Sequence, residues 1–226
     1  SSGEATERRI GEFVHLLKAK DPKPRILLIG GGTVGQGASA LYSDEDIELV
    51  SFDIYASDFV QFVADAHELP LADSSVDGVL IQAVLEHVLR PDVVVAEISR
   101  VLKSQGLVYS ETPFLQQVHE GPYDFTRFTE SGHRYLFRNF ALISSGASGG
   151  SGSQLLWSLD YFFRGLFRSK MAGKIAKILF FWVKYADRFI PEKYHIDSAS
   201  GVYFFGQKSQ QPISPKDIIG HYKGAQ

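Results

Sequence analysis

The spacing of apolar residues changes near the start of the chain. Within residues 4–20 the apolar positions share one helical face: Ile10, Phe13, Val14 and Leu17. Such a face predicts an amphipathic helix that packs on a larger core. Two prolines interrupt the pattern at 21–24, and residues 25–29 then form a continuous apolar run, which is typical of a strand buried on both faces. We therefore expect a covering helix within 1–24, followed by the main domain over 25–207.

Short apolar runs and helical patterns then alternate along the chain. The predicted strands are 25–29, 47–54, 58–63, 76–81, 107–112, 141–145 and 202–206. The predicted helices are 91–102, 129–140, 154–168 and 171–190, and 208–226 is expected to be a surface tail. Alternation of this kind is typical of an α/β fold with a mostly parallel sheet and right-handed connections. In such a sheet, ligands bind at the carboxyl ends of the strands.

A glycine-rich turn follows the first predicted strand. Gly30, Gly32 and Gly35 have the Gly-x-Gly-x-x-Gly spacing, which lets the backbone turn tightly and approach a ligand. We expect a helix to follow, with free N–H groups at its start. Asp53 ends the next strand, where its carboxylate could accept both ribose hydroxyls of an adenosine. The pattern favours a nucleotide-type cofactor, although a glycine connector and a turn-capping Asp would have the same sequence.

Charge and cysteine content narrow the class of protein. The net charge is −3 and there are no cysteines, which argues against a general nucleic-acid coat and excludes disulfides and thiolate metal sites. The first residues show no basic and apolar leader, and no apolar run reaches the roughly 18 residues that a membrane span requires. We therefore expect a cytoplasmic protein, and we regard nucleic acid as an improbable partner.

Four further motifs follow in a fixed order after the second strand. They are Asp65-Ala66-His67-Glu68-Leu69-Pro70, Asp73-Ser74-Ser75-Val76-Asp77, Val84-Leu85-Glu86-His87-Val88 and Glu97-Ile98-Ser99-Arg100-Val101-Leu102-Lys103. With the glycine turn, this set resembles the type-11 class I methyltransferases, which use S-adenosylmethionine (SAM) and act on small molecules. The resemblance covers roughly residues 25–114. It implies a Rossmann-like fold with a seven-stranded, mostly parallel sheet, helices on both faces and a helical insert at 154–190 before the last strand.

The same resemblance implies where SAM binds. Gly30 and Gly32 would lie against its methionine part, Asp53 with Ile54 beside it would hold the ribose, and Asp65 with Ala66 would contact the adenine. Gln82 would line the floor of the site, and His87 would either face the cofactor or cap a turn. Two departures are visible. Val34 stands where the family usually has Gly, and only 11 residues separate Asp53 from Asp65, too few for the usual crossover helix.

The candidate acceptor side is the polar segment 113–129. Methyl transfer needs mainly alignment of the reacting groups, but a hydroxyl acceptor gains from a positioned base. We predict His119 as that base, with Glu120, Tyr123, Asp124 and Arg127 positioning the acceptor or one another. A structural alternative is an Asp124–Arg127 ion pair beside a solvated histidine. No metal site is predicted, because Glu86-His87 and His119-Glu120 are adjacent pairs rather than ligands on one helical face.

The predicted insert carries the strongest local charge. Residues 155–190 hold seven basic and two acidic residues, a net charge of +5, interleaved with aromatic and aliphatic residues. This pattern suits either contact with an anionic membrane or a lid or dimer face. Together with the 119–129 stretch, the insert also resembles methyltransferases of surface-glycan pathways, which implies transfer to an oxygen of a small-molecule, sugar or lipid-linked acceptor.

Other functions have weaker support. A nicotinamide-dependent oxidoreductase could use the same glycines and Asp53, but no Tyr-x-x-x-Lys occurs in the chain. Gly146-x-Ser148-x-Gly150, with His195 or His221 downstream, matches the spacing of an esterase nucleophile, although within a Gly/Ser tract. A protein that binds the cofactor without turnover has the same sequence signature. A base-modifying nucleic-acid methyltransferase is disfavoured by Gln82-Ala83-Val84-Leu85, which lacks the Pro-Pro-aromatic motif of that class.

Overall fold

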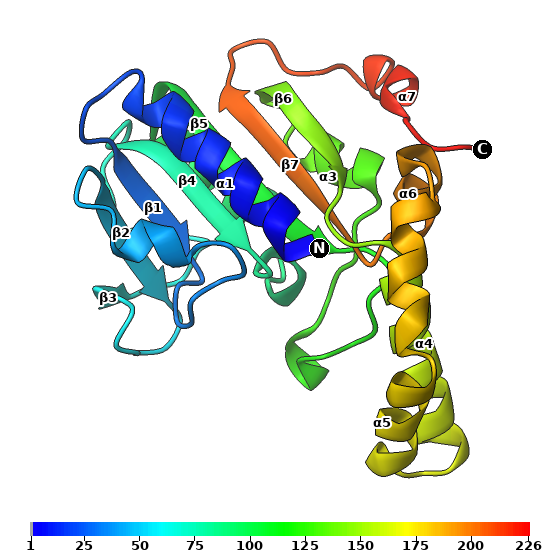
Figure 1. Cartoon of the computed structure of the whole chain (residues 1–226). Helices are drawn as coiled ribbons and strands as arrows, with labels where there is room; N and C mark the ends of the chain where they lie inside the picture. The colour runs from blue at the N-terminus through cyan, green and yellow to red at the C-terminus, as the bar shows by residue number, and fades with distance from the viewer. Residues whose placement is uncertain (1) are drawn as a thin grey trace.

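The computed structural model describes residues 2–226 and contains one seven-stranded sheet (Figure 1). Its strands are β1 Arg25–Ile29, β2 Glu48–Asp53, β3 Phe62–Val63, β4 Val76–Gln82, β5 Leu102–Pro113, β6 Phe140–Ala147 and β7 Gly201–Lys208. Their order across the sheet is β3-β2-β1-β4-β5-β7-β6, and β7 runs antiparallel to both of its neighbours. The predicted Rossmann-like class with a mostly parallel sheet is confirmed.

Helices cover both faces of the sheet. Helix α1 (Ser2–Lys18) lies across one face, where its Phe13 and Leu17 are buried (Figure 1). It packs so close to β4 that a side chain at Gly78 would meet Phe13 and Leu17. Helices α2 (Pro91–Val101) and α3 (Glu130–Leu136) cover the other face. The sheet thus has an apolar core on each side, and its strand ends are left to the loops.

The first crossover differs from the prediction. No α-helix follows the glycine turn in the described chain, and a 3₁₀ turn at Ser39–Tyr42 is the only helical segment between β1 and β2. Gly37 explains this difference, because its φ is +75° and a Cβ there would lie 2.8 Å from the backbone nitrogen of Glu7 in α1. The segment therefore turns against α1. The predicted strand 58–63 is likewise reduced to the two residues of β3.

An elongated helical arm connects β6 to β7 and projects beyond the sheet (Figure 1). It consists of α4 Ser151–Leu166, α5 Lys170–Leu179, a 3₁₀ segment Phe181–Phe189 and α6 Glu192–Ser198. The arm corresponds to the two predicted helices 154–168 and 171–190. The second of these ends at Leu179 and continues as the 3₁₀ segment. We use the name arm for residues 151–198 from here on.

Two acidic residues fix the arm internally. Asp187 accepts the backbone N–H groups of Gly152 and Ser153 at the start of α4, at 2.5 and 3.2 Å. Asp160 pairs with Arg164 at 2.9 Å and with Lys177 of α5 at 3.0 Å. Both acidic groups of the 155–190 segment are therefore used inside the arm.

The chain after β7 is more ordered than a simple surface tail. It forms α7 (Asp217–His221), and His221 Nε2 lies 2.9 Å from the buried carboxylate of Glu130 in α3. Lys223 Nζ donates to Ser145 Oγ of β6 at 3.0 Å. The last residues thus pack on the edge of the sheet formed by β6.

Candidate active site

The glycine turn is held by the ends of β1 and β2. The N–H groups of Gly30 and Gly31 both donate to the carbonyl of Phe52, and Gly30 has a φ of +78°. The Gly32 N–H donates to Asp53 Oδ2 at 2.8 Å, while Ile54 N–H donates to Asp53 Oδ1 at 2.7 Å. A Cβ at Gly32 would lie 2.7 Å from Asp53 Oδ2, so only glycine allows this approach. The predicted glycine turn therefore contacts Asp53, the residue predicted to bind the ribose.

The remaining predicted cofactor residues lie at the same ends of neighbouring strands. Asp65 follows β3, is exposed, and accepts hydrogen bonds from the His67 N–H and ring that lower the pKa of its carboxyl. Ala66 beside it is buried. Gln82 ends β4 and donates to the Gln36 carbonyl, and its Oε1 would lie 2.6 Å from a Cβ at Gly35. The roles of these residues toward SAM remain predictions, now with a common location at the carboxyl edge.

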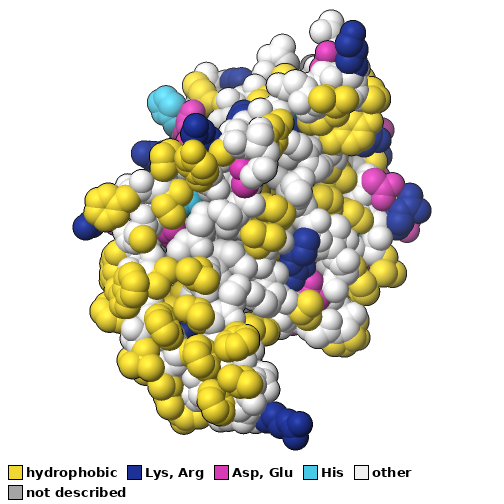
Figure 2. Space-filling model, turned by 90° about the vertical axis from the view of Figure 1, so that its right-hand side faces the viewer, with side chains coloured by type: hydrophobic (Ala, Val, Ile, Leu, Met, Phe, Trp, Pro, Cys, Tyr) yellow, Lys and Arg dark blue, Asp and Glu magenta, His cyan; other side chains and the backbone are white. Residues whose placement is uncertain are grey.

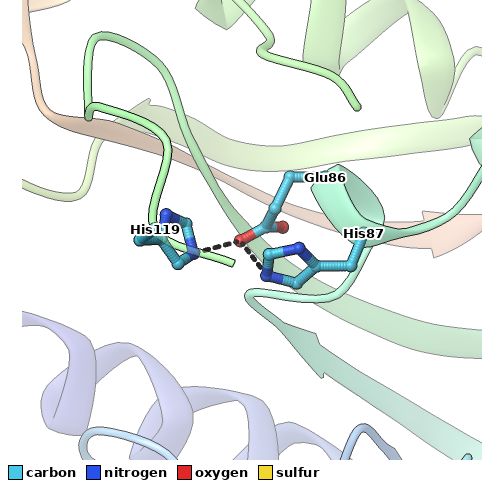
Figure 3. Close-up of side chains that lie close together, drawn as sticks. All are labelled: Glu86, His87 and His119. Atoms are coloured by element: carbon cyan, nitrogen blue, oxygen red, sulfur yellow. Dashed lines mark ion pairs between the residues drawn. The ribbon is translucent and has the colours of Figure 1, made fainter. Parts of the chain in front are cut away.

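A second group of side chains forms beside this edge (Figure 3). Glu86 and His87 lie in the 3₁₀ turn Leu85–His87 after β4, and His119 lies in the loop after β5. Both rings point their Nε2 atoms at Glu86 Oε1, at 3.6 Å from His87 and 3.8 Å from His119. The two rings meet edge to face with centroids 5.0 Å apart. We call these three residues the Glu–His–His cluster.

Glu86 is the residue of this cluster that sequence reasoning missed. Its side chain is fully buried, and burial raises the pKa of its carboxyl to about 7. Its backbone carbonyl accepts the Phe125 N–H at 2.8 Å and so holds the acceptor-side loop. The available signal was a carboxylate between Leu85 and Val88, next to a buried strand, where a charged side chain requires a reason.

The hydrogen bonds of the two imidazoles define where their protons lie. His87 Nδ1 is 2.7 Å from the Tyr123 carbonyl, which can only accept, so Nδ1 carries the hydrogen. His119 Nδ1 faces the Gln117 carbonyl at 3.3 Å and Asp124 Oδ2 at 3.4 Å, with the same consequence. Both Nε2 atoms therefore present lone pairs when the rings are neutral. His87, predicted beside the cofactor, is part of the acceptor-side cluster.

Asp124 and Arg127 form the ion pair that was the structural alternative. The Asp124 side chain is 1% exposed and is bound by two guanidinium nitrogens of Arg127, which hold the pKa of that carboxyl well below its usual range. Arg127 also donates to the Gln116 carbonyl at 2.9 Å, and Asp124 accepts the His119 N–H at 3.0 Å. The pair therefore fixes the loop that carries His119. Tyr123 contributes its carbonyl, while its side chain is largely exposed.

A cavity of about 230 Å³ lies between this loop and the arm. His119 and Gln117 line it from the loop, while Trp157 and Lys177 line it from the arm. His119 thus belongs both to the cavity wall and to the Glu–His–His cluster. The cavity lies beside the loop that follows the carboxyl end of β5, the end of the sheet at which ligands of such folds bind.

Comparisons with known proteins agree with this arrangement. The model of a methyltransferase domain matches residues 31–110. A protein from Galdieria sulphuraria described as a sarcosine dimethylglycine methyltransferase has a similar structure, with TM-score 0.59 and 14% identity over 92% of this chain and 86% of that one. A SAM-dependent methyltransferase from Archaeoglobus fulgidus gives TM-score 0.57 and 15% identity over 91% and 94%. No curated protein is similar enough in sequence to match.

A third similar structure contains the cofactor. It is phosphoethanolamine N-methyltransferase 2 from Haemonchus contortus in complex with SAM, with TM-score 0.54 and 18% identity over 88% of this chain and 53% of that one. Residues 31–110 are therefore a methyltransferase domain, and the matched domain together with the shared fold supports SAM as its cofactor.

The esterase interpretation fails on geometry. His195 contacts Ser151 at the start of α4, at 2.9 Å from its Oγ, rather than Ser148. His221 is bound to Glu130. Neither histidine is paired with Ser148, so the Gly146-x-Ser148-x-Gly150 spacing marks no nucleophile.

Proposed function

We propose that this methyltransferase transfers the methyl group of SAM to a hydroxyl oxygen of a sugar or lipid-linked acceptor. The observation that carries the proposal is the Glu–His–His cluster at the end of β4, beside the cavity under the arm. A neutral amine can attack a sulfonium without help, whereas a hydroxyl is a poor nucleophile until its proton is withdrawn. His119 lines the cavity and is the group of the cluster placed to act on that proton.

His119 is the residue on which we expect acceptor activation to depend. It lines the cavity, contacts Glu86 and is oriented by Asp124. His119→Ala should lower turnover by about 10²-fold or more and leave SAM affinity unchanged. His15→Ala, which removes an exposed histidine of α1, is the matched control. Equal turnover of His119→Ala and wild type would assign His119 to structure alone.

The acceptor class can be measured directly. The protein is incubated with deuteromethyl SAM and a panel of polyprenyl-linked sugars, free sugars and amines, and tandem mass spectrometry locates the label. We expect the label on an oxygen of a sugar-bearing acceptor. Label on nitrogen only would contradict the proposed function.

The surface of the arm supports a lipid-linked acceptor. Figure 2 shows hydrophobic side chains gathered over the arm. The large apolar residues exposed there include Leu155, Phe162, Leu166, Phe167, Met171, Ile175, Ile178, Leu179, Phe181, Trp182 and Phe189. A continuous exposed apolar surface of this kind marks an interaction site. No helix in the described part of the chain is long and apolar enough to cross a bilayer. An exposed apolar surface that also carries basic residues suits binding to the surface of a membrane.

The charge of the arm fits an anionic surface. Asp160 and Asp187 both make their contacts within the arm. The basic residues of the arm beyond the Asp160 network are Arg168, Lys170, Lys174, Lys184, Arg188 and Lys193, against Glu192 and Asp197 as its other acidic residues. Each cation near an anionic membrane contributes about 1 kcal/mol of attraction. Basic and aromatic side chains together therefore favour peripheral binding to anionic lipid.

Membrane contact makes a specific prediction for two exposed residues of α5. Ile178→Asp with Leu179→Asp should reduce sedimentation with anionic phosphatidylglycerol vesicles by about tenfold or more, because charges cannot enter the apolar boundary at low cost. Ile219→Asp, in α7 outside the arm and 78% exposed, is the control and should sediment like wild type. If the wild-type protein does not sediment with these vesicles, or forms a dimer that buries the arm, the membrane proposal is wrong.

A further inference from the structure

We propose that Glu86, His87 and His119 bind one divalent transition-metal ion. Carboxylate and imidazole are the ligand types that zinc and iron sites combine, often as two histidines and one carboxylate with positions left open for substrate. One ligand atom from each residue lies within 4.8 Å of the other two. The inference goes beyond the proposed function, since binding of an ion does not depend on which acceptor atom is methylated.

The distances are close to those of a loaded site. Ligand atoms about 2.0–2.2 Å from one ion lie roughly 3–3.5 Å from each other. Glu86 Oε1 is 3.6 Å from His87 Nε2 and 3.8 Å from His119 Nε2, and Figure 3 shows the three side chains converging. These separations exceed a hydrogen bond, so the groups do not satisfy one another directly.

The buried carboxylate gives independent support. Glu86 Oε1 has no hydrogen-bond partner among residues 2–226, and the side chain is 0% exposed. Its other oxygen accepts the Thr112 hydroxyl at the long distance of 3.5 Å. Leaving a buried carboxylate oxygen unpartnered is costly, and a cation between the two rings would provide the partner.

The outer contacts of both histidines are those of metal ligands. Metal-binding histidines usually donate their second ring N–H to a carbonyl or carboxylate, which fixes the ring and leaves the other nitrogen free. His87 donates through Nδ1 to the Tyr123 carbonyl, and His119 Nδ1 faces Asp124. Each Nε2 is thereby aimed at Glu86. Arg127 in turn binds Asp124, so Asp124 orients His119 and is itself fixed by Arg127.

An ion in this place changes the expected role of His119. Its Nε2 would bind the ion, so His119 would act as a ligand rather than as the base that the sequence suggested. A hydroxyl bound to such an ion becomes more acidic, which is the chemistry that an oxygen acceptor needs. As a metal ligand, His119 would still be needed for turnover, so the effect expected for His119→Ala is the same.

The site can be tested by metal binding alone. Untagged full-length protein, stripped with chelator, is titrated calorimetrically with ZnCl₂ and MnCl₂, and Co²⁺ is added to follow its visible absorption. We expect one ion per chain, with Co²⁺ bands typical of nitrogen ligands. His119→Ala and Glu86→Gln should each weaken binding by about 100-fold or more, and Asp124→Asn by about 10–100-fold, because Asp124 orients the His119 ring.

Matched controls separate this site from general metal affinity. His15→Ala removes an exposed histidine outside the cluster and should bind like wild type. Thermal unfolding of Glu86→Gln in the presence of chelator shows whether the variant is folded before it is titrated. Absence of binding to the wild-type protein, or binding that His119→Ala and Glu86→Gln leave unchanged, overturns the proposal. The titrations use a metal ion alone and no acceptor. They therefore test the metal site, while the labelling experiment tests the transfer to oxygen.

Discussion

Asp53→Ala should abolish measurable binding of SAM. The carboxylate is the predicted acceptor for both ribose hydroxyls, so the variant would lose two hydrogen bonds to SAM. The variant would also lose the acceptor of the Gly32 N–H, which lies 2.8 Å from Asp53 Oδ2. Hydrogen bonds to a charged group contribute about 1.5–3 kcal/mol each, so losing two weakens binding by about 10²-fold to 10⁴-fold. Isothermal titration with SAM and with S-adenosylhomocysteine measures the effect.

The matched control is Asp58→Ala, which removes an exposed carboxylate five residues further along the same segment. Its affinity for SAM should equal that of wild type. Unchanged affinity of Asp53→Ala would remove the cofactor site from the carboxyl edge of β1 and β2, and with it the positions assigned to Gly32 and Ile54.

Arg127→Met should destabilise the fold by about 3–5 kcal/mol. Removing one partner of a buried ion pair leaves the other charge uncompensated, and the Asp124 side chain is 1% exposed. The loop also loses the guanidinium donor to the Gln116 carbonyl. Urea unfolding followed by circular dichroism gives the change in free energy of unfolding. Turnover should fall as well, because the loop that carries His119 loses its internal support.

Arg90→Met provides the comparison for an exposed pair. Arg90 binds Asp92 at 2.8 Å, but both side chains are at least half exposed, and such pairs contribute about 0–1 kcal/mol. A loss below about 1 kcal/mol for Arg127→Met as well would mean that the Asp124–Arg127 pair does not stabilise the acceptor-side loop.

The core of the fold was predictable because its signals are local. The buried strands 25–29 and 76–81 are continuous apolar runs, and the Pro91 helix has a regular apolar stripe, so β1, β4 and α2 match their predictions closely. The helix expected after the glycine turn does not form. There the packing of Gly37 on α1 decides the path, and no pattern within 33–38 reports a contact with residue 7.

The candidate site shows a similar division. Asp53 and the glycine turn were predictable because their spacing follows from one β-turn-β unit. The Glu–His–His cluster was not, because His119 is 32 residues from His87 and reaches it only through the pairing of β4 with β5. The sequence interpretation treated Glu86-His87 and His119-Glu120 as separate adjacent pairs. In the structure, a 3₁₀ turn places Glu86 and His87 beside His119. The arm was foreseen as basic and amphipathic, but its break after Leu179 was not.

Glu86 links the turn after β4 to the loop after β5. Its side chain points into the cluster, while its carbonyl receives the N–H groups of Phe125 and Thr126 from the acceptor-side loop. A graft of segment 114–128 onto another scaffold would therefore lose its anchor unless the turn after β4 were transferred with it. Libraries that vary segment 114–128 without the turn after β4 should therefore yield mostly inactive proteins.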